Sequence, residues 1–365
     1  MNTRSVIPRA ARPDGRGTAL RPANRFERQS EEAFDDGWDT LADEAPAPET
    51  VLIRDSTRSI ISWNESPDLG FDRGLNPYRG CEHGCIYCYA RPSHAWLGYS
   101  PGLDFETKLI FKPDAATILE RELSKKSYTP APIVLGSNTD PYQPVERRLR
   151  LTRAVLDVLD RFNHPVSIVT KSAGVLRDLD ILSDMARRNL ARVHLSITTL
   201  DPRLARAMEP RAATPARRLD AVSQLAAAGV PVGVLAAPMI PGLNDAELER
   251  ILEVASHAGA STANAILLRL PHELADLFSD WLNRTVPDRA AHVLSLIRQT
   301  RAGALNDAGF GSRFRGTGAY AGLLSARFRK AARQYGLDGK PAALDCGAFA
   351  RPITRAAPAA QLSLF

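Results

Sequence analysis

The chain has 365 residues, of which 44% are hydrophobic and 24% charged, so it is long and apolar enough to bury a large core in one or two domains. Four cysteines exclude a secreted disulfide scaffold, no apolar run approaches the roughly 20 residues of a membrane helix, and the N-terminus lacks the apolar stretch of a signal peptide. A reducing, cytoplasmic setting is therefore expected, and the net charge of +6 permits an anionic partner without requiring one.

The first 55 residues differ in composition from the middle of the chain. Residues 4–28 carry seven arginines against two acids, and residues 31–49 then carry eight acids with no lysine or arginine. Segregated charge with few large apolar residues is typical of disordered chain. Residues 1–55 are therefore predicted to form a disordered, charged leader.

A repeated alternation of strands and helices follows. Short β-rich apolar runs end at small or polar residues, and most are followed by a pattern of helical period. The predicted strands are Leu75–Tyr78, Ile133–Ser137, Val166–Lys171, Val193–Thr199, Val232–Ala237 and Ala265–Leu270. The predicted helices are Leu151–Phe162, Val175–Arg188, Pro215–Ala228, Asn244–Ala258, His272–Arg284 and Pro287–Ala302. Gly229 and Gly259 are placed to end two of these helices, and an Asn-Asp pair at Asn244 is placed to cap another.

Six β/α units with strand starts about 30 residues apart predict an α/β fold with a parallel sheet, either doubly wound or curled into part of a barrel. Functional residues of such a sheet belong at the C-terminal ends of the strands. No glycine-rich nucleotide fingerprint follows any predicted strand, so a Rossmann cofactor site is not expected. We place this core at residues 67–304, a basic helical extension at 305–346 and a flexible tail at 347–365.

Three of the four cysteines form the strongest motif in the chain. Cys81, Cys85 and Cys88 occur within eight residues, with the spacing Cys-x3-Cys-x2-Cys. So tight a loop can direct three thiolates to one centre, with Gly80 and Gly84 relaxing the backbone. Three thiolates on a four-iron cube leave one iron without a protein ligand, and a substrate or cofactor can bind there.

A zinc site is the alternative for these cysteines. Its fourth ligand would be His83 or a more distant group. His83 lies inside the short loop, where it is poorly placed to complete a tetrahedron with the flanking thiolates.

With Tyr87 before the last cysteine, the motif resembles that of the radical S-adenosylmethionine (SAM) superfamily. The resemblance extends over roughly residues 69–303, and it implies a partial (β/α)6 barrel, here with a helical C-terminal extension. It also implies that the three cysteines hold a 4Fe–4S cluster whose open iron binds the amino and carboxylate groups of SAM. Reduction by a donor such as flavodoxin or ferredoxin would then cleave SAM to methionine and a 5′-deoxyadenosyl radical, which abstracts hydrogen from a substrate.

Within the superfamily, the segment Asn76-Pro-Tyr-Arg-Gly-Cys81 and the strand ends most resemble the spore photoproduct lyase-like branch, also called DNA-repair-photolyase-like. The resemblance implies that residues 136–140 contact the methionyl end of SAM, that Lys171 pairs with its carboxylate, and that residues 238–242 form an apolar adenine shelf. The candidate cofactor-binding residues are Tyr87, Ser137, Asn138, Lys171, Ser196, Thr198 and Met239. Each has a local alternative, such as a solvated lysine or a hydroxyl bonded to nearby backbone.

One departure from that branch concerns the hydrogen donor. The photoproduct lyases use a cysteine near the end of the second strand, whereas residues 133–137 here, Ile-Val-Leu-Gly-Ser, contain none. The sequence therefore does not support reversal of a thymine dimer. Cys346 is a candidate catalytic substitute that the C-terminal segment would deliver; the alternative is that it is a small packed residue.

Two further segments bear on partners. Residues 312–335 carry six basic residues, four aromatics and no acid, as binding of a nucleic-acid strand requires. The alternative is an amphipathic helix at Leu323–Ala332 whose arginines face water. The last five residues resemble the short peptide by which bacterial replication and repair proteins bind the DNA sliding clamp. The contact residues would be Gln361, Leu362, Leu364 and Phe365.

The sequence thus predicts a radical SAM enzyme with lyase-like or DNA-repair-like chemistry on nucleic acid, and no membrane association. Two alternatives stay open. One is radical modification of a protein or small molecule, and the other is a non-catalytic iron–sulfur or zinc module that binds DNA and the clamp.

Overall fold

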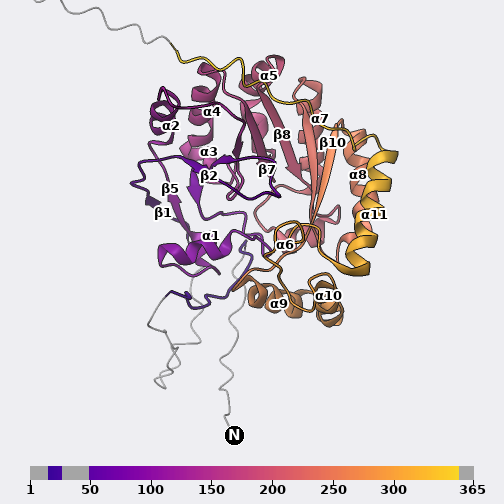
Figure 1. The fold of residues 1–365 in the computed structure, drawn as a ribbon. Helices are drawn as coiled ribbons and strands as arrows, with labels where there is room; N and C mark the ends of the chain where they lie inside the picture. Colours follow the sequence, from indigo (N-terminus) through magenta and orange to yellow (C-terminus); the bar gives the residue numbers. More distant parts are fainter. Residues whose placement is uncertain (1–14, 27–48, 353–365) are drawn as a thin grey trace, which may run out of the picture.

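The computed structural model describes residues 15–26 and 49–352, and its main feature is a seven-stranded sheet with the order β10-β9-β8-β7-β6-β3-β2 (Figure 1). The strands of this sheet are β2 (Ile61–Trp63), β3 (Arg73–Leu75), β6 (Ile133–Leu135), β7 (Val166–Thr170), β8 (Ala191–Ser196), β9 (Val232–Met239) and β10 (Thr262–Leu267). All neighbours run parallel except β2 and β3, which are antiparallel. The predicted parallel α/β core is confirmed, and no pairing among the described residues closes the sheet into a full barrel.

The predicted strand Leu75–Tyr78 is divided between two sheets. The second sheet has the order β1-β5-β4 and consists of β1 (Val51–Arg54), β5 (Lys108–Phe111) and β4 (Tyr78–Arg79). Pro77 separates β3 from β4, because proline has no N–H to donate to a ladder. Its carbonyl accepts a hydrogen bond from the backbone N–H of Lys112 at 3.0 Å. The chain therefore leaves the main sheet just before the cysteines.

All six predicted helices are present. The α-helices are α1 (Asp104–Thr107), α2 (Ala115–Leu123), α3 (Glu146–Leu149), α4 (Leu151–Arg161), α5 (Leu179–Arg187), α6 (Pro202–Met208), α7 (Pro215–Ala227), α8 (Leu248–His257), α9 (Leu274–Thr285), α10 (Pro287–Gln299) and α11 (Gly318–Gln334). The 3-10 helices are η1 (Arg91–Leu97), η2 (Ala173–Asp178) and η3 (Asp245–Glu247). Gly229 and Gly259 follow α7 and α8 with positive φ, as expected.

The predicted side-chain cap at Asn244 is absent. Its amide instead accepts from the backbone N–H of Ile240 at 2.6 Å and donates to the carbonyl of Thr198 at 2.7 Å. Asn244 therefore ties the segment after β9 to the segment after β8, and these long-range partners compete successfully with the local capping bond.

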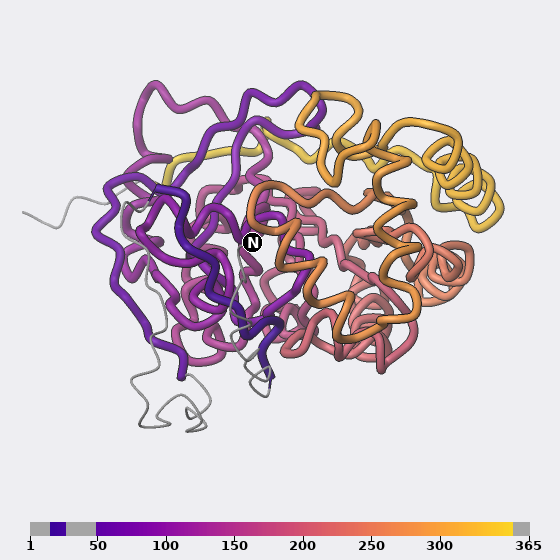
Figure 2. Tube along the Cα trace, turned by 90° about the horizontal axis from the view of Figure 1, so that it is seen from below, coloured from indigo at the N-terminus to yellow at the C-terminus, as the bar shows by residue number. Residues whose placement is uncertain are grey.

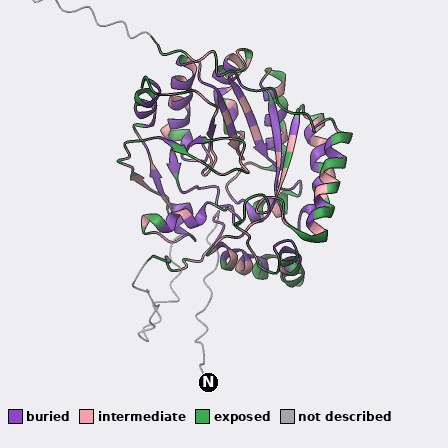
Figure 3. Cartoon of the chain, viewed as in Figure 1, coloured by how far each residue is buried: buried purple, intermediate pink, exposed green. Residues whose placement is uncertain are grey.

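The two faces of the main sheet differ in burial. On β7 and β8, Ile168 and Val193 are fully buried, whereas their neighbours Val169 and His194 are only partly buried. Helices α4, α5, α7 and α8 share a hydrophobic core with the first face (Figures 1 and 2). Figure 3 shows buried residues gathered on the strands and on the helix sides that meet them.

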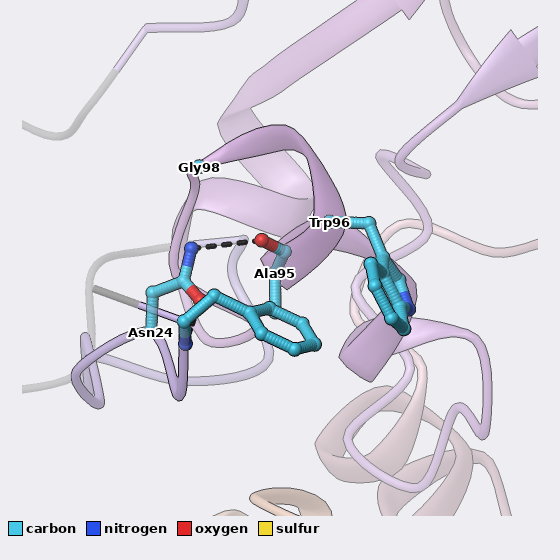
Figure 4. Close-up of a pocket in the computed structure, with 5 residues that line it drawn as sticks. Asn24, Ala95, Trp96 and Gly98 are labelled. Atoms are coloured by element: carbon cyan, nitrogen blue, oxygen red, sulfur yellow. Dashed lines mark hydrogen bonds between the residues drawn. The ribbon is translucent and has the colours of Figure 1, made fainter.

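The leader prediction is wrong for the described part of residues 1–55. Buried side chains there include Arg16, Thr18 and Asn24, and residues 51–54 form β1. The Asn24 amide donates to the carbonyl of Ala95 at 2.8 Å, beside a surface pocket of about 280 Å³ that Phe26 and Trp96 also line (Figure 4). Composition did not indicate this packing because the partners are distant in sequence. Residues 1–14 and 27–48 lie outside the described residues.

The tail prediction is likewise wrong for residues 347–352. A C-terminal strap, residues 342–351, crosses the N-terminal ends of β7 and β8 (Figure 1). Asp345 N–H donates to the carbonyl of Asn189 at 2.9 Å, and Ala350 N–H donates to the carbonyl of Phe162 at 3.0 Å. No helix among the described residues is long and apolar enough to cross a bilayer.

Candidate functional site

The loop of residues 80–90, the cysteine loop, lies at the C-terminal ends of the parallel strands. Ile86 N–H donates to the carbonyl of Met208, at the end of α6, at 3.0 Å. Arg211 N–H donates to the carbonyl of His83 at 3.3 Å. Both partners belong to the segment that follows β8. Two of the three clustered thiols are buried and that of Cys88 is partly exposed, so the motif lies where a site was expected.

Two glycines give the cysteine loop its shape. Gly80 and Gly84 have φ angles of +81° and +68°. A Cβ atom on Gly84 would lie 2.7 Å from Oε2 of Glu106, and one on Gly80 would lie 2.9 Å from the carbonyl oxygen of Phe105. The expected need for glycine at both positions is confirmed, because a side chain would be strained and would clash.

A buried ion pair braces the cysteine loop. The fully buried guanidinium of Arg91 donates to the carbonyls of Cys85 at 2.9 Å and Gly84 at 3.1 Å, and it contacts Oε1 of Glu106 at 2.5 Å. Oε2 of Glu106 accepts from Gly17 N–H at 2.8 Å. Arg91 and Glu106 belong to no recognisable sequence motif, so the sequence did not predict this ion pair.

The thiols have the chemistry of cluster ligands. Burial raises the pKa of Cys81 well above its ordinary value, and Asp140 and the neighbouring cysteines raise it further. Burial and Glu209 raise the pKa of Cys85, whereas Lys171 lowers it. Bound iron reverses this effect, because a coordinating thiol is deprotonated. Among the described residues, no three Cys, His, Asp or Glu side chains converge on one metal-ion position.

His83 is engaged away from the thiols. Its Nδ1 lies 3.4 Å from Oδ2 of Asp140, and this oxygen also accepts from Lys171 N–H at 2.7 Å. Oδ1 of Asp140 accepts from the Thr170 hydroxyl at 2.7 Å. Burial alone would raise the pKa of Asp140, but His83 and these hydrogen bonds lower it to about 2. The ionised Asp140 therefore ties the cysteine loop to the end of β7.

Tyr87 and Thr198 meet in a buried polar network. The Thr198 hydroxyl lies 3.1 Å from the Tyr87 hydroxyl and donates to Oε1 of Glu209 at 2.7 Å. Glu209 also accepts from Tyr87 and pairs with the buried guanidinium of Arg218. Ser196 is buried beside them, and its carbonyl accepts from Arg218 at 2.9 Å. Glu209 and Arg218 were missed, since neither belongs to a motif.

The side chain of Asn76, for which the sequence predicts no role of its own, holds Ser137 and Asn138 in place. Asn76 donates to the Ser137 hydroxyl at 3.3 Å, and its side-chain oxygen accepts from the N–H groups of Asn138 and Thr139 at 3.0 and 3.1 Å. The Asn-Pro segment before the cysteines thus shapes the backbone after β6.

Lys171 and Met239 lie in different surroundings. The ammonium group of Lys171 lies 5.7 Å from the ring centroid of Tyr87 and makes no hydrogen bond to any residue that the structure describes. Met239 is buried at the end of β9 and lines a cavity of about 260 Å³ together with Phe314 and Arg329. Of the two, Lys171 is beside the cysteine loop.

The structure does not bring Cys346 to this site. Cys346 belongs to the C-terminal strap at the N-terminal ends of the strands, and its thiol faces the carbonyl of Leu344 at 3.8 Å. The cysteine loop lies at the opposite ends. The expectation that the C-terminal segment delivers a hydrogen donor is therefore wrong for this arrangement of the chain.

The basic segment 312–335 is partly neutralised. Arg313 forms two hydrogen bonds to Asp68, and Arg327 forms two to Glu249, so the arginines do not all face water. The predicted amphipathic helix lies within α11. The clamp-like peptide at residues 361–365 lies outside the described residues.

Three comparisons place the chain among known proteins. The sequence model of the radical SAM superfamily matches residues 75–255. Uncharacterized proteins of Mycobacterium bovis and Mycobacterium tuberculosis are 35% identical over 233 residues, which is 63% of this chain and 68% of theirs. An uncharacterized protein of Methanocaldococcus jannaschii is 31% identical over 47% of this chain and 62% of its own.

Among solved structures, spore photoproduct lyase is similar in fold. One of its structures has a TM-score of 0.56 at 17% identity, covering 78% of this chain and 79% of the lyase. Another, with bound AdoMet and dinucleoside spore photoproduct, has a TM-score of 0.56 at 16% identity and covers 84% and 85%. At this identity the likeness shows the fold alone. The chain belongs to the radical SAM superfamily, whose members use a 4Fe–4S cluster and S-adenosylmethionine.

Proposed function

We propose that this radical SAM enzyme holds its cluster through Cys81, Cys85 and Cys88 and acts on nucleic acid in a lyase-like or repair-like reaction. The cysteine loop is the observation that carries the proposal. Three thiols lie at the C-terminal ends of the parallel strands, in a loop that a buried ion pair and two positive-φ glycines hold in place. When bound, the cluster and SAM supply a 5′-deoxyadenosyl radical that removes a hydrogen atom from the substrate.

The residues around the cysteine loop are suited to orient SAM. Lys171 offers an ammonium group without a hydrogen-bond partner in the described chain, beside the ring of Tyr87, and we assign it to the carboxylate of SAM. Asn76 fixes the backbone after β6, where Ser137 and Asn138 would meet the methionyl end. Thr198 would act through Tyr87, because its hydroxyl is already hydrogen-bonded to Glu209.

The nucleic-acid target rests on fold likeness and on the chemistry of the site's surroundings. Spore photoproduct lyase has been solved in complex with dinucleoside spore photoproduct. In the present chain, arginines and partly exposed aromatic rings lie next to the cysteine loop, and this combination suits phosphate groups and base faces. Because residues 133–137 contain no cysteine, we do not propose thymine-dimer reversal itself.

The test is anaerobic reconstitution with iron and sulfide, followed by dithionite and SAM, with 5′-deoxyadenosine as the readout. We expect product from the wild type and a loss of at least 100-fold in Cys85→Ala, because without that thiolate the cluster has only two cysteine ligands in the loop. Cys346→Ala is the matched control, since this cysteine lies at the other end of the sheet, and it should retain wild-type product. A fully loaded wild type that forms no product would contradict the proposal.

A nucleic-acid substrate should raise 5′-deoxyadenosine formation in the same assay. Stimulation by a peptide or a small metabolite, with none by DNA or RNA, would favour the alternative of protein or small-molecule modification.

We also propose that residues 361–365 bind the DNA sliding clamp, a partner that would bring the enzyme to DNA. Two leucines and a phenylalanine suit an apolar pocket, and Gln361 and Ser363 suit its polar rim. A pull-down on immobilised clamp should retain the full chain and lose a chain that ends at residue 360. Equal retention of both chains would refute the assignment.

A further inference from the structure

An arginine beside the cysteine loop forms no ion pair with any acid within residues 15–26 and 49–352. Arg269 follows β10 by two residues, between the buried Leu268 and Leu270. Its guanidinium lies between two rings, 5.1 Å from the centroid of Tyr89 and 5.3 Å from that of Phe314. It makes no hydrogen bond to any residue within 15–26 or 49–352, and its Nε is buried without a partner.

The acid that could neutralise Arg269 is committed elsewhere. Asp68 forms hydrogen bonds of 2.8 and 2.5 Å to Arg313, whose guanidinium lies over Phe314 and Phe310 at 4.7 and 4.9 Å. Burial lowers the pKa of Arg269; Tyr89 and the more distant Asp68 oppose this shift, and Arg313 adds to it. A half-buried cation that forms no ion pair of its own is costly, so a bound anion would stabilise Arg269.

The position of Arg269 connects it to the reaction. Tyr89 directly follows the third clustered cysteine, and its hydroxyl hydrogen-bonds to the carbonyl of Ser137 after β6. The Asp68–Arg313 pair joins the loop before β3 to the loop before α11, so it links segments from opposite sides of the open sheet. Phe310 is 62% exposed and Tyr89 is 46% exposed. Two arginines and three aromatic rings thus alternate in a row that ends at Tyr89, next to the cysteine loop.

We propose that Arg269 binds a backbone phosphate of the nucleic-acid substrate, with Tyr89 and Phe314 fixing its guanidinium and Phe310 offering a face on which a base can stack. This assignment rests on the proposed function, because it names part of the substrate site of the same enzyme. A guanidinium forms paired hydrogen bonds to phosphate, and rings on both sides restrict its orientation. The carboxylate of SAM is the competing oxyanion, so the test measures both ligands.

The test measures fluorescence anisotropy of a 5′-fluorescein-labelled 12-nucleotide single strand on the cluster-loaded enzyme over a series of salt concentrations. We expect Arg269→Gln to weaken binding about 10-fold and to reduce the slope of log affinity against log salt by about one phosphate contact. Arg269→Lys should keep the salt slope, because the charge remains, while losing part of the affinity. Arg217→Gln, an exposed arginine on α7, is the charge-matched control and should stay within about twofold.

Each other outcome overturns the assignment. Wild-type affinity and slope in Arg269→Gln would overturn it and leave the nucleic-acid function intact, whereas no binding by the wild type would overturn both. Equilibrium dialysis with labelled SAM is the second arm. If Arg269→Gln loses SAM affinity in place of oligonucleotide affinity, the anion is the carboxylate of the cofactor. Iron content and circular dichroism establish that each variant is folded. If Arg269→Gln does not fold, Arg269→Lys replaces it in the test, and unchanged oligonucleotide affinity in that variant would overturn the assignment.

Discussion

At the level of single residues, the buried pair Arg91–Glu106 controls the geometry of the cysteine loop. Glu106→Gln keeps the size of the side chain but leaves the buried guanidinium without its counter-charge. We expect the free energy of unfolding to fall by about 3 kcal/mol, and the cluster to be lost more readily, because Arg91 also holds the carbonyls of Gly84 and Cys85. Urea unfolding and the iron content after gel filtration measure the two effects.

The control for this prediction is an ion pair at the surface. Arg161 and Glu120 form a contact of 2.7 Å in which both side chains are about half exposed. Glu120→Gln should cost only about 0–1 kcal/mol and leave the iron content unchanged. Equal losses in the two variants would show that Glu106 does not act through the cysteine loop.

The residues that sequence reasoning found are those whose signal is local. The three cysteines and Tyr87 fall within eight residues, so spacing and residue type were enough. Glu209 was not predicted, because it meets Tyr87 from 122 positions away and only the folded chain brings the two together. The prediction of a catalytic role for Cys346 was wrong for the same reason, because the residues next to it in the sequence do not indicate which end of the sheet it lies at.

At the level of elements, residues 15–26 form a segment that supports the cysteine loop from outside. Arg16 donates to the carbonyl of Glu106 at 2.8 Å, and the carbonyl of Leu20 accepts from Leu103 N–H at 2.9 Å. Deleting residues 1–26 should therefore lower cluster retention and the melting temperature, because Glu106 loses its bond from Gly17 and buried surface becomes exposed.

A shorter deletion tests whether this segment is responsible. Removing residues 1–14 alone should leave both iron content and melting temperature near the wild-type values. If the two truncations behave alike, packing of residues 15–26 does not stabilise the cysteine loop.

Elements were predicted well where a hydrophobic period identifies them and poorly where composition was the only guide. The parallel strands and their helices follow from apolar periodicity, which reports the face that each element buries. Residues 15–26 were predicted to be disordered because of segregated charge and few large apolar residues, and the part of the C-terminal strap from residue 347 onward was predicted to belong to a flexible tail. Residues 15–26 and the strap both pack through backbone hydrogen bonds to segments distant in the sequence. Amino-acid composition cannot predict such contacts, because it carries no information about which segments meet in the fold.

At the level of the whole molecule, the two ends of the sheet have different tasks. The C-terminal ends carry the cysteine loop and the polar residues around it, whereas the strap covers the N-terminal ends of β7 and β8. Phe349 of the strap packs edge-on against His164, with 5.7 Å between ring centroids. Nδ1 of His164 donates to the carbonyl of Pro165 at 3.0 Å, and Nε2 lies 2.7 Å from the Tyr128 hydroxyl. The neutral ring satisfies both contacts.

Buried neutral histidines such as His164 make the free energy of unfolding depend on pH. Burial lowers the pKa of His94, His164 and His194 to about 4 each. An unfolded histidine titrates near pH 6.5, so the unfolded chain takes up protons first as the pH falls. The stability that neutral burial contributes is fully present above about pH 6.5 and is lost progressively toward pH 4, by on the order of 1–2 kcal/mol per histidine between pH 7 and pH 5.

Urea unfolding of Cys85→Ala at both pH values isolates this effect from acid loss of the cluster. Adding His164→Gln to that variant should make the dependence on pH shallower by about a third; an unchanged dependence would mean that His164 titrates normally in the folded protein.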